Sequence, residues 1–499
     1  MVRNRPVAPP AGPSIARRRG TLIVLCIVQF MLVLDDTVVS VALPSIRDDL
    51  GFAGTSLAWV VNGYFLAFGG LLILGGRLAD VLGRRRVFVW GGAVFVAASL
   101  LCAIAAEPWQ LIAGRFVQGI GAAIASPAAL ALITRMFTDP RERARALGAW
   151  GAVAALGATS GLVISGVLTG LASWRWIFLI NLPVAILALV LVPRLVRDSR
   201  APGTGGRIDI PGAVLGTAAA VCLVYGILHT AETGLGHPGS MIPLLASVAL
   251  AIAFIAVEAR VRHPLIPASF FRVRVRLIAN VVTLLTSAAL FAMSFLLMIH
   301  VQTVLNYDPL TAGLAYLPYG AGILTGIWLS ARAVARFGTR TVLTASLLGT
   351  AVGHLLLAGI APEDEYLIGV LPGLLGVSFS SGLALPALAT AALTGTDDHD
   401  AGLGSAIFTS MQQIGGATGL ALLVALATSR TEAVLADGGT PARAATDGFA
   451  LGMLGAAVLL GLAAVVAALF MRVERTPLAV AGSQDHARTG PSIPEAGSE

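Results

Sequence analysis

Fourteen long apolar runs divide the sequence, and they limit the possible fold more than any other feature. They lie at about 20–43, 56–76, 86–106, 110–135, 144–171, 176–193, 210–230, 241–258, 277–304, 311–331, 341–361, 366–392, 402–428 and 447–471. Each is close to the roughly 20 residues that an α-helix needs to cross a bilayer. The chain is 57% hydrophobic and 12% charged, more apolar than a water-soluble domain can bury. We therefore expect an all-α integral membrane protein.

The arginines predict how the chain crosses the membrane. With the N-terminus inside, the inside loops would hold most of them, including Arg84, Arg85, Arg86, Arg141, Arg143, Arg145, Arg272, Arg274, Arg276, Arg332, Arg336 and Arg340. The outside loops would hold Arg47, Arg175, Arg430 and Arg443, and only the inside loop at 397–400 opposes this bias. The positive-inside rule then places both termini in the cytoplasm. The composition suggests a GC-rich bacterial genome, so we expect a bacterial cytoplasmic (inner) membrane.

An internal repeat predicts how the helices are grouped. Gly76–Arg85 has a degenerate copy at Ala331–Arg340, and Ser126-Pro127-Ala128 resembles Leu385-Pro386-Ala387. In both cases the two copies lie eight runs apart. Two six-helix units alone would place them six runs apart, so two helices must separate the units. The predicted parts are a disordered tail at 1–19, halves at 20–197 and 277–471, two inserted helices at 209–259, and a second disordered tail at 472–499.

Charge and cysteine placement exclude several other classes of protein. The net charge of +7 comes from arginines in short loops, which favours membrane topology over nucleic-acid binding. Cys26, Cys102 and Cys222 all lie inside apolar runs, which argues against disulfides and a metal site. No glycine-rich nucleotide loop with lysine or nucleophile–base pair is visible. We expect no cofactor, no enzymatic activity and a functional monomer.

Two carboxylates, Asp35 and Asp36, interrupt the first apolar run. An aspartate near the centre of a transmembrane helix costs about 2.5–3.5 kcal/mol, so it points to function. Arg115 is the one basic residue well inside a run, and the helix rise puts Asp35 and Arg115 at similar depths, roughly 13 and 9 Å from the outer end. We expect them to pair, either as a static ion pair or as a proton-coupling pair. Asp36, about 100° around the helix, either joins the proton coupling or bonds a neighbouring helix.

Several motifs resemble the major facilitator superfamily, in particular its fourteen-span branch of drug:proton antiporters. Leu34–Pro44 is similar to the branch pattern L-D-x-T-[IV]-V-N-V-A-L-P, with Ser40 in place of Asn. Gly76–Arg85 matches the loop G-x-L-A-D-x-x-G-R-[RK], and 115–121 matches R-x-x-Q-G-x-G. The resemblance implies the major facilitator fold, with two pseudo-symmetric halves. It also implies an inner gate formed by Gly76, Asp80, Gly83, Arg84 and Arg85, although the arginines alone could serve only topology.

Glycines in the run at 144–171 resemble the antiporter motif G-x-x-x-G-P-x-x-G-G. Gly157, Gly161 and Gly166 fit it, whereas Leu162 replaces the proline and Ser165 the first of the paired glycines. Four-residue glycine spacing lets helices approach closely. In the family this motif accompanies export. The segment Trp174–Pro183 also resembles the export branch.

Polar residues in the later runs are candidates for a substrate cavity: Asn280, Thr283, Ser287, Met293, Gln412 and Gln413. Small hydroxyls in such helices also commonly bond their own backbone.

The resemblance implies a proton-coupled exporter of amphipathic small molecules, such as antibiotics or dyes, working by alternating access. Its partners would be the substrate, protons and the lipid bilayer. Two alternatives stay open at this stage. One is a carrier of a metabolite or lipid precursor on the same fold, and the other is a membrane receptor that binds its ligand without transport.

Overall fold

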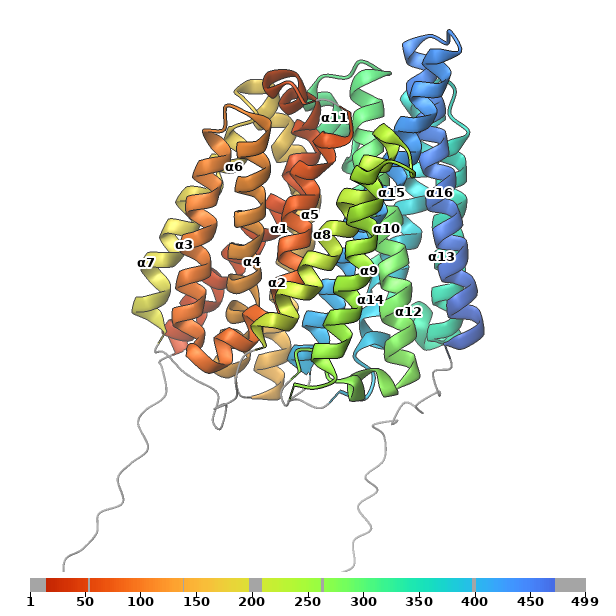
Figure 1. Ribbon diagram of the computed structural model, residues 1–499. Coiled ribbons are helices and arrows are strands. Elements are labelled where there is room, and N and C mark those ends of the chain that lie inside the picture. The colour runs from red at the N-terminus through yellow and green to blue at the C-terminus, as the bar shows by residue number, and fades with distance from the viewer. Residues whose placement is uncertain are drawn as a thin grey trace, which may run out of the picture.

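The computed structural model describes residues 15–52, 54–137, 139–196, 209–261, 264–396 and 401–471. Helices make up almost all of this part of the chain, and no strand occurs in it (Figure 1). The predicted disorder of 1–14 and 472–499, and the acidic loop at 397–400, fall outside the described residues. Helix α1 begins at Ile15, so residues 15–19 continue the first helix rather than belonging to the predicted tail.

Nineteen helices of different lengths follow one another along the described residues. The first group is α1 (Ile15–Leu50), η1 (Gly54–Leu57), α2 (Ala58–Leu82), α3 (Arg84–Ala103), α4 (Pro108–Met136), α5 (Pro140–Leu171), α6 (Trp176–Leu179) and α7 (Asn181–Leu195). Two helices come next, α8 (Ile210–Thr233) and α9 (Pro238–Glu258). The last group is η2 (Ala268–Arg272), α10 (Arg274–Thr303), α11 (Pro309–Ala315), α12 (Leu317–Phe337), α13 (Thr339–Ala358), η3 (Tyr366–Val370), α14 (Leu371–Ala392), α15 (Ala401–Ala436) and α16 (Pro441–Phe470).

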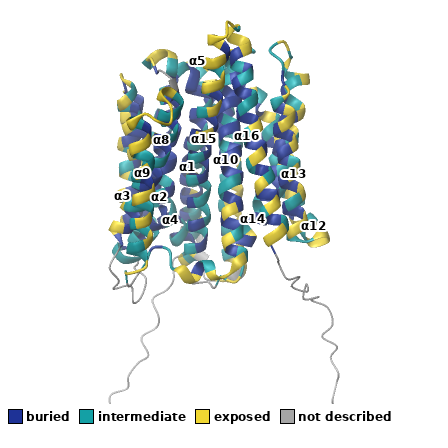
Figure 2. Ribbon diagram, turned by 45° about the vertical axis from the view of Figure 1, so that its right-hand side comes forward, coloured by how far each residue is buried: buried dark blue, intermediate teal, exposed yellow. Residues whose placement is uncertain are grey.

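The described residues contain 14 helical segments long and apolar enough to cross a membrane. They coincide with the fourteen predicted runs, some of which combine two elements, as α11 and α12 do in the segment Pro309–Phe337. Exposed residues run along the outer helices (Figure 2), and many of them are large and apolar. A multi-pass membrane protein explains both features, because lipid rather than water then surrounds these side chains.

The two groups of helices pack in the same pattern. In the first, α4 packs against α2 and α3, and α1 packs against α5; in the second, α14 packs against α12 and α13, and α10 packs against α15. Gly83 and Gly338, the aligned glycines of the repeat, both end a helix with positive φ, at 110° and 83°. L side chains rarely adopt such angles, so both turns favour glycine. The aligned glycines of the repeat thus lie at equivalent turns of the two groups of helices.

Helices α8 and α9 form a hairpin outside the two repeats. Helix α8 packs against both α2 and α15, where the two groups of helices meet, whereas α9 contacts mainly α8. At Gly70 of α2 a Cβ atom would collide with the side chain of Thr217 in α8, so the two helices lie very close. The hairpin therefore covers one seam between the two halves.

Helix α1 begins and α16 ends at the same face of the bundle, the lower one in Figure 1. We call it the termini face and the opposite one the far face. Near the far face the halves meet where α5 packs against α11, and where the Gln302 amide of α10 donates a hydrogen bond of 2.9 Å to the Val41 carbonyl of α1.

Candidate functional site

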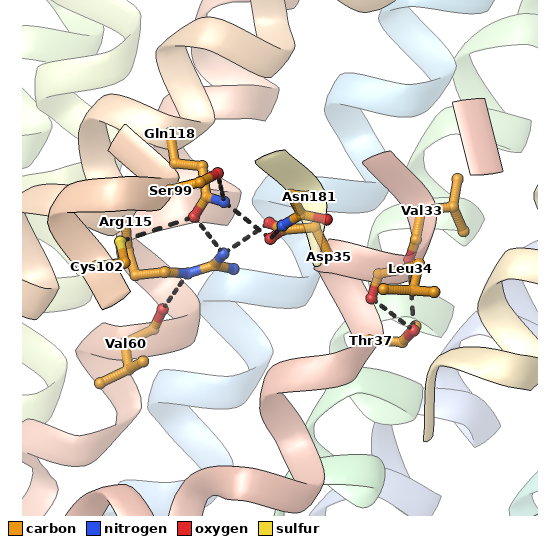
Figure 3. Close-up of polar contacts among 10 residues, drawn as sticks. All are labelled: Val33, Leu34, Asp35, Thr37, Val60, Ser99, Cys102, Arg115, Gln118 and Asn181. Carbon is orange, nitrogen blue, oxygen red and sulfur yellow. Dashed lines mark hydrogen bonds and ion pairs between the residues drawn. The ribbon is translucent and has the colours of Figure 1, made fainter. Parts of the chain in front are cut away.

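The predicted pair of Asp35 and Arg115 forms in the interior of the first half. Nη1 of Arg115 lies 2.7 Å from Oδ2 of Asp35, and both side chains are 0% exposed (Figure 3). Nε of Arg115 donates to the Val60 carbonyl of α2 at 3.0 Å. The pair therefore ties α1, α2 and α4 together.

Two amides complete the surroundings of the Asp35 carboxylate. Oδ1 accepts hydrogen bonds from Nε2 of Gln118 at 2.8 Å and from Nδ2 of Asn181 at 2.6 Å (Figure 3). Gln118 in turn accepts from Arg115 at 2.7 Å and donates to the Ser99 hydroxyl at 2.9 Å. We call Asp35, Arg115, Gln118, Asn181 and Ser99 the Asp35 network.

An aromatic ring covers the guanidinium of this network. Cζ of Arg115 lies 4.4 Å from the centre of the Tyr64 ring, and the Phe178 ring lies 5.8 Å away. The face of an aromatic ring attracts a cation. A buried ion pair is tolerated only when further hydrogen bonds satisfy its remaining donors and acceptors. The amides and rings supply these contacts, although Nη2 of Arg115 has no hydrogen-bond partner among the described residues.

The sequence indicated Gln118 and Asn181 only as letters of longer motifs and gave them no role. Gln118 lies one helical turn after Arg115, and Asn181 is a single amide in an apolar segment. A polar side chain isolated in such a segment needs a buried partner. That signal would have pointed to both residues.

Asp36 faces a different environment from Asp35. It lines a cavity of about 290 Å³ between the first half and α15, which we call the central cavity. The lining residues come from α1, α2, α4, α5 and α15: Gln29, Leu32, Val33, Asp36, Tyr64, Phe68, Leu72, Ser126, Pro127, Leu130, Trp150, Gly402, Ser405, Ala406, Thr409, Gln412 and Gln413. Because Gly402 is in the first turn of α15, the cavity reaches from the termini face to about the middle of the bundle.

The predicted cavity residues divide into two sets. Gln412 and Gln413 line the central cavity. Asn280, Thr283, Ser287 and Met293 do not; all four are buried in α10, which packs against α15 and α16. Asn280 donates to the Arg276 carbonyl at 2.8 Å and Thr283 to the Ala279 carbonyl at 2.7 Å. None of the four therefore lines the central cavity; the Asn280 amide nitrogen and the Thr283 hydroxyl bond their own helix, while Oδ1 of Asn280 has no hydrogen-bond partner among the described residues.

The residues of the expected inner gate lie at the termini face. Nη2 of Arg84 is 3.0 Å from Oδ1 of Asp80, and Arg85 donates to the carbonyls of Pro193 and Val196, each at 3.4 Å. Gly83 makes the turn between α2 and α3, and a Cβ atom on Gly76 would lie 3.7 Å from Pro127. Arg85 therefore fastens the start of α3 to the end of α7.

The three motif glycines of α5 contact two different helices. A Cβ atom on Gly157 would lie 2.9 Å from the Phe30 carbonyl of α1, and one on Gly161 would collide with Thr37. On Gly166 it would lie 2.6 Å from the Pro309 carbonyl of α11. Gly157 and Gly161 thus bring α5 close to α1, while Gly166 brings the two halves together near the far face.

The departures from the glycine motif also take part in these contacts. Ser165 is fully buried and donates a hydrogen bond to the Val38 carbonyl of α1. The Leu162 carbonyl would lie 2.8 Å from a Cβ atom on Gly313 of α11. The close packing of α5 is therefore kept although the motif is altered.

A model of the Major Facilitator Superfamily matches residues 25–420. The chain belongs to the Major Facilitator Superfamily. The puromycin resistance protein pur8 of Streptomyces alboniger is 43% identical over 88% of this chain and 87% of its own length. The lincomycin resistance protein of Streptomyces lincolnensis is 40% identical, covering 83% and 86%, and the cephamycin export protein CmcT of Amycolatopsis lactamdurans is 38% identical, covering 88% and 91%.

Solved structures of other transporters share the fold at low sequence identity. A bacterial homologue of the human lysosomal transporter Spinster superimposes with a TM-score of 0.64 at 15% identity, covering 92% of this chain and 98% of that one. A D-xylose–proton symporter gives 0.61 at 15%, covering 90% and 97%. The family expected from the motifs is confirmed, and so is its all-helical fold.

Proposed function

We propose that this chain is a proton-coupled exporter of amphipathic small molecules of the antibiotic type. The observation that carries the proposal is a buried carboxylate–guanidinium pair, Asp35 and Arg115, one residue away from the carboxylate that lines the central cavity. The names of relatives at 38–43% identity, which refer to antibiotic resistance and export, support the choice of substrate.

The packing of the two halves supports alternating access. The central cavity reaches the termini face, while α5 and α11 close the far face around Gly166 and Pro309. Rocking one half against the other would separate these helices and close the opposite end. The arrangement fits a carrier whose substrate site lies between repeats near the middle of the membrane.

The Asp35 network is the proposed proton-responsive element. While Arg115 stays against Asp35, the carboxylate stays ionised, because its charge is paired and hydrogen-bonded. When Arg115 withdraws, an unpaired carboxylate in a water-poor interior is costly, so it takes up a proton. Return of the guanidinium releases that proton on the other side. One proton crossing 100 mV supplies about 2.3 kcal/mol, close to a 50-fold gradient of a neutral substrate.

We further propose that both termini are cytoplasmic, in a bacterial cytoplasmic membrane, and that the protein works as a monomer. The central cavity then opens to the cytoplasm, as a cell needs in order to collect its cargo for export. Residues 20–197 and 277–471 are the moving halves, the hairpin within 209–259 covers the seam of α2 and α15, and Asp80 with Arg84 belongs to the inner gate.

Transport by the purified protein in proteoliposomes tests the proposal. Because substrate and protons move in opposite directions, a pH gradient should drive accumulation of puromycin or lincomycin on its acidic side. Asp35→Asn should abolish this accumulation. Asp437→Asn removes an exposed carboxylate at the turn after α15 and serves as the charge control. Full proton-driven transport by Asp35→Asn contradicts the assignment of the proton site. The absence of puromycin and lincomycin movement under any gradient contradicts export of this class.

A further inference from the structure

Three oxygen atoms of residues that line the central cavity have no hydrogen-bond partner among the described residues. They are Oδ1 of Asp36, Oε1 of Gln29 and Oε1 of Gln413, and each is shielded from solvent. All three are acceptors. A buried polar atom without a partner costs roughly 1–3 kcal/mol, so a ligand that donates to these oxygens gains what the empty protein lacks.

The charge of the cavity lining also favours a ligand that is positively charged. Among the described residues that line the cavity, Asp36 is the one with a charge. Arg115 is bonded to Asp35, and no described residue that lines the cavity carries a positive charge to pair with Asp36 there. Trp150 and Phe68 add aromatic surface to the lining, and Gln413 lies within hydrogen-bonding reach of Asp36. Aromatic faces and a carboxylate both stabilise a cation in a site that excludes water.

We propose that Asp36, Gln29 and Gln413 form a subsite for a protonated amine on the transported molecule. This inference rests on the proposed function, and it adds the chemical class of the cargo. A protonated primary or secondary amine supplies a positive charge to pair with Asp36. It also supplies N–H donors for the three oxygens that have no hydrogen-bond partner. A quaternary ammonium satisfies the charge alone, and a neutral amide satisfies neither in full.

The two adjacent acids thereby have separate tasks. Asp35 is enclosed by Arg115, Gln118 and Asn181 and does not line the cavity. Asp36, about 100° around α1, selects the cargo. Asp36 is a specificity residue, and its replacement should alter which molecules bind rather than whether the cavity binds apolar molecules.

Three fluorescent probes of nearly equal size separate these contributions. Monodansylcadaverine has a protonated primary amine, its trimethylammonium analogue has charge without N–H donors, and its N-acetyl derivative is neutral. Dansyl fluorescence of the purified full-length protein in detergent reports the Kd of each probe. We expect the amine to bind at least about tenfold more tightly than the acetylated probe, a difference of about 1.4 kcal/mol. The trimethylammonium probe should lie between them.

Variants then assign this preference to the subsite. Asp36→Asn should bring the three Kd values to within about twofold of one another, and Asp36→Glu should keep the preference for the amine. Gln413→Leu should narrow the difference between the amine and the trimethylammonium probe, while Asp437→Asn should match the wild type.

Equal Kd values for the three probes in the wild type, or an unchanged preference in Asp36→Asn, would overturn the proposal. In either case the cavity would still bind amphipathic molecules, and the proposed function would stand. If the wild type binds no probe at all, the proposed function fails together with this inference.

Discussion

Asp35 and Asp36 are neighbours in the chain but belong to different environments, since Asp35 is sealed against Arg115 whereas Asp36 lines the central cavity. The 100° step between consecutive helical residues is what separates them. This separation permits the proposed division of roles, in which Asp35 responds to protons and Asp36 recognises cargo.

Neutralising one partner of the buried pair should destabilise the protein, and neutralising both should restore much of the stability. Arg115→Gln leaves the Asp35 carboxylate buried without its counterion, which typically costs about 3–5 kcal/mol. The double variant Asp35→Asn with Arg115→Gln leaves two neutral amides and no buried charge, although glutamine is shorter than the arginine it replaces. Thermal unfolding in detergent should give a low Tm for Arg115→Gln and a Tm near the wild type for the double variant.

The same double variant separates a static role of the pair from a proton-coupling role. If the pair only fixes helix packing, the folded double variant should keep proton-driven transport. We expect it to bind substrate but to show no accumulation driven by a pH gradient. Retained accumulation would show that the pair is structural.

Gly166→Ala should weaken the closure of the far face. The added Cβ atom would lie 2.6 Å from the Pro309 carbonyl, and overpacking of this kind usually costs about 1–3 kcal/mol. Gly148→Ala on the same helix is the matched control, because nothing lies within 4 Å of its Cβ position. Alanine there should be neutral or slightly stabilising. Equal Tm values for the two variants would contradict the close contact of α5 and α11.

Gly338→Ala should destabilise the protein through the backbone alone. Nothing lies within 4 Å of its Cβ position, but φ is 83° and ψ is 153°, a region nearly reserved for glycine. Backbone strain of this kind costs about 1–3 kcal/mol. Gly461→Ala in α16, where space is also free and φ is not positive, should leave the Tm unchanged or raise it. A Gly338→Ala variant as stable as the wild type would contradict the described turn.

Asp308 should make the start of α11 sensitive to acid. Hydrogen bonds from the Thr311 hydroxyl and backbone N–H hold the pKa of Asp308 below its usual value. A carboxylate with a lowered folded-state pKa stabilises the fold above its unfolded pKa of about 3.9, and this contribution is lost as pH falls through the folded-state pKa. The difference in Tm between wild type and Asp308→Asn should therefore be larger at pH 6 than at pH 3. A difference that does not change with pH would contradict the role of the charge.

The sequence was sufficient for the fold and for the central pair. Run length and repetition determine the number of spanning helices, because lipid permits few alternatives. The Asp35–Arg115 contact was predictable because the helix rise fixes depth, and an unpaired buried charge is too costly.

The lining of the cavity was harder to predict, since depth does not fix how a nearly uniform apolar helix is rotated about its own axis. Asn280 and Thr283 therefore appeared as suitable as Gln412 and Gln413. Trp150 and Tyr64 gave no signal, because aromatic residues are equally common in helix packing.

Proton release on substrate binding tests the central claim most directly. Purified protein in weakly buffered solution, mixed with puromycin while pH is recorded, should release one proton for each molecule whose binding converts the form with Arg115 withdrawn and Asp35 protonated into the form with Arg115 paired to an ionised Asp35. Asp35→Asn should bind the molecule and release none. Release of the same size from Asp35→Asn, or binding by the wild type without any release, would contradict proton coupling at the Asp35–Arg115 pair.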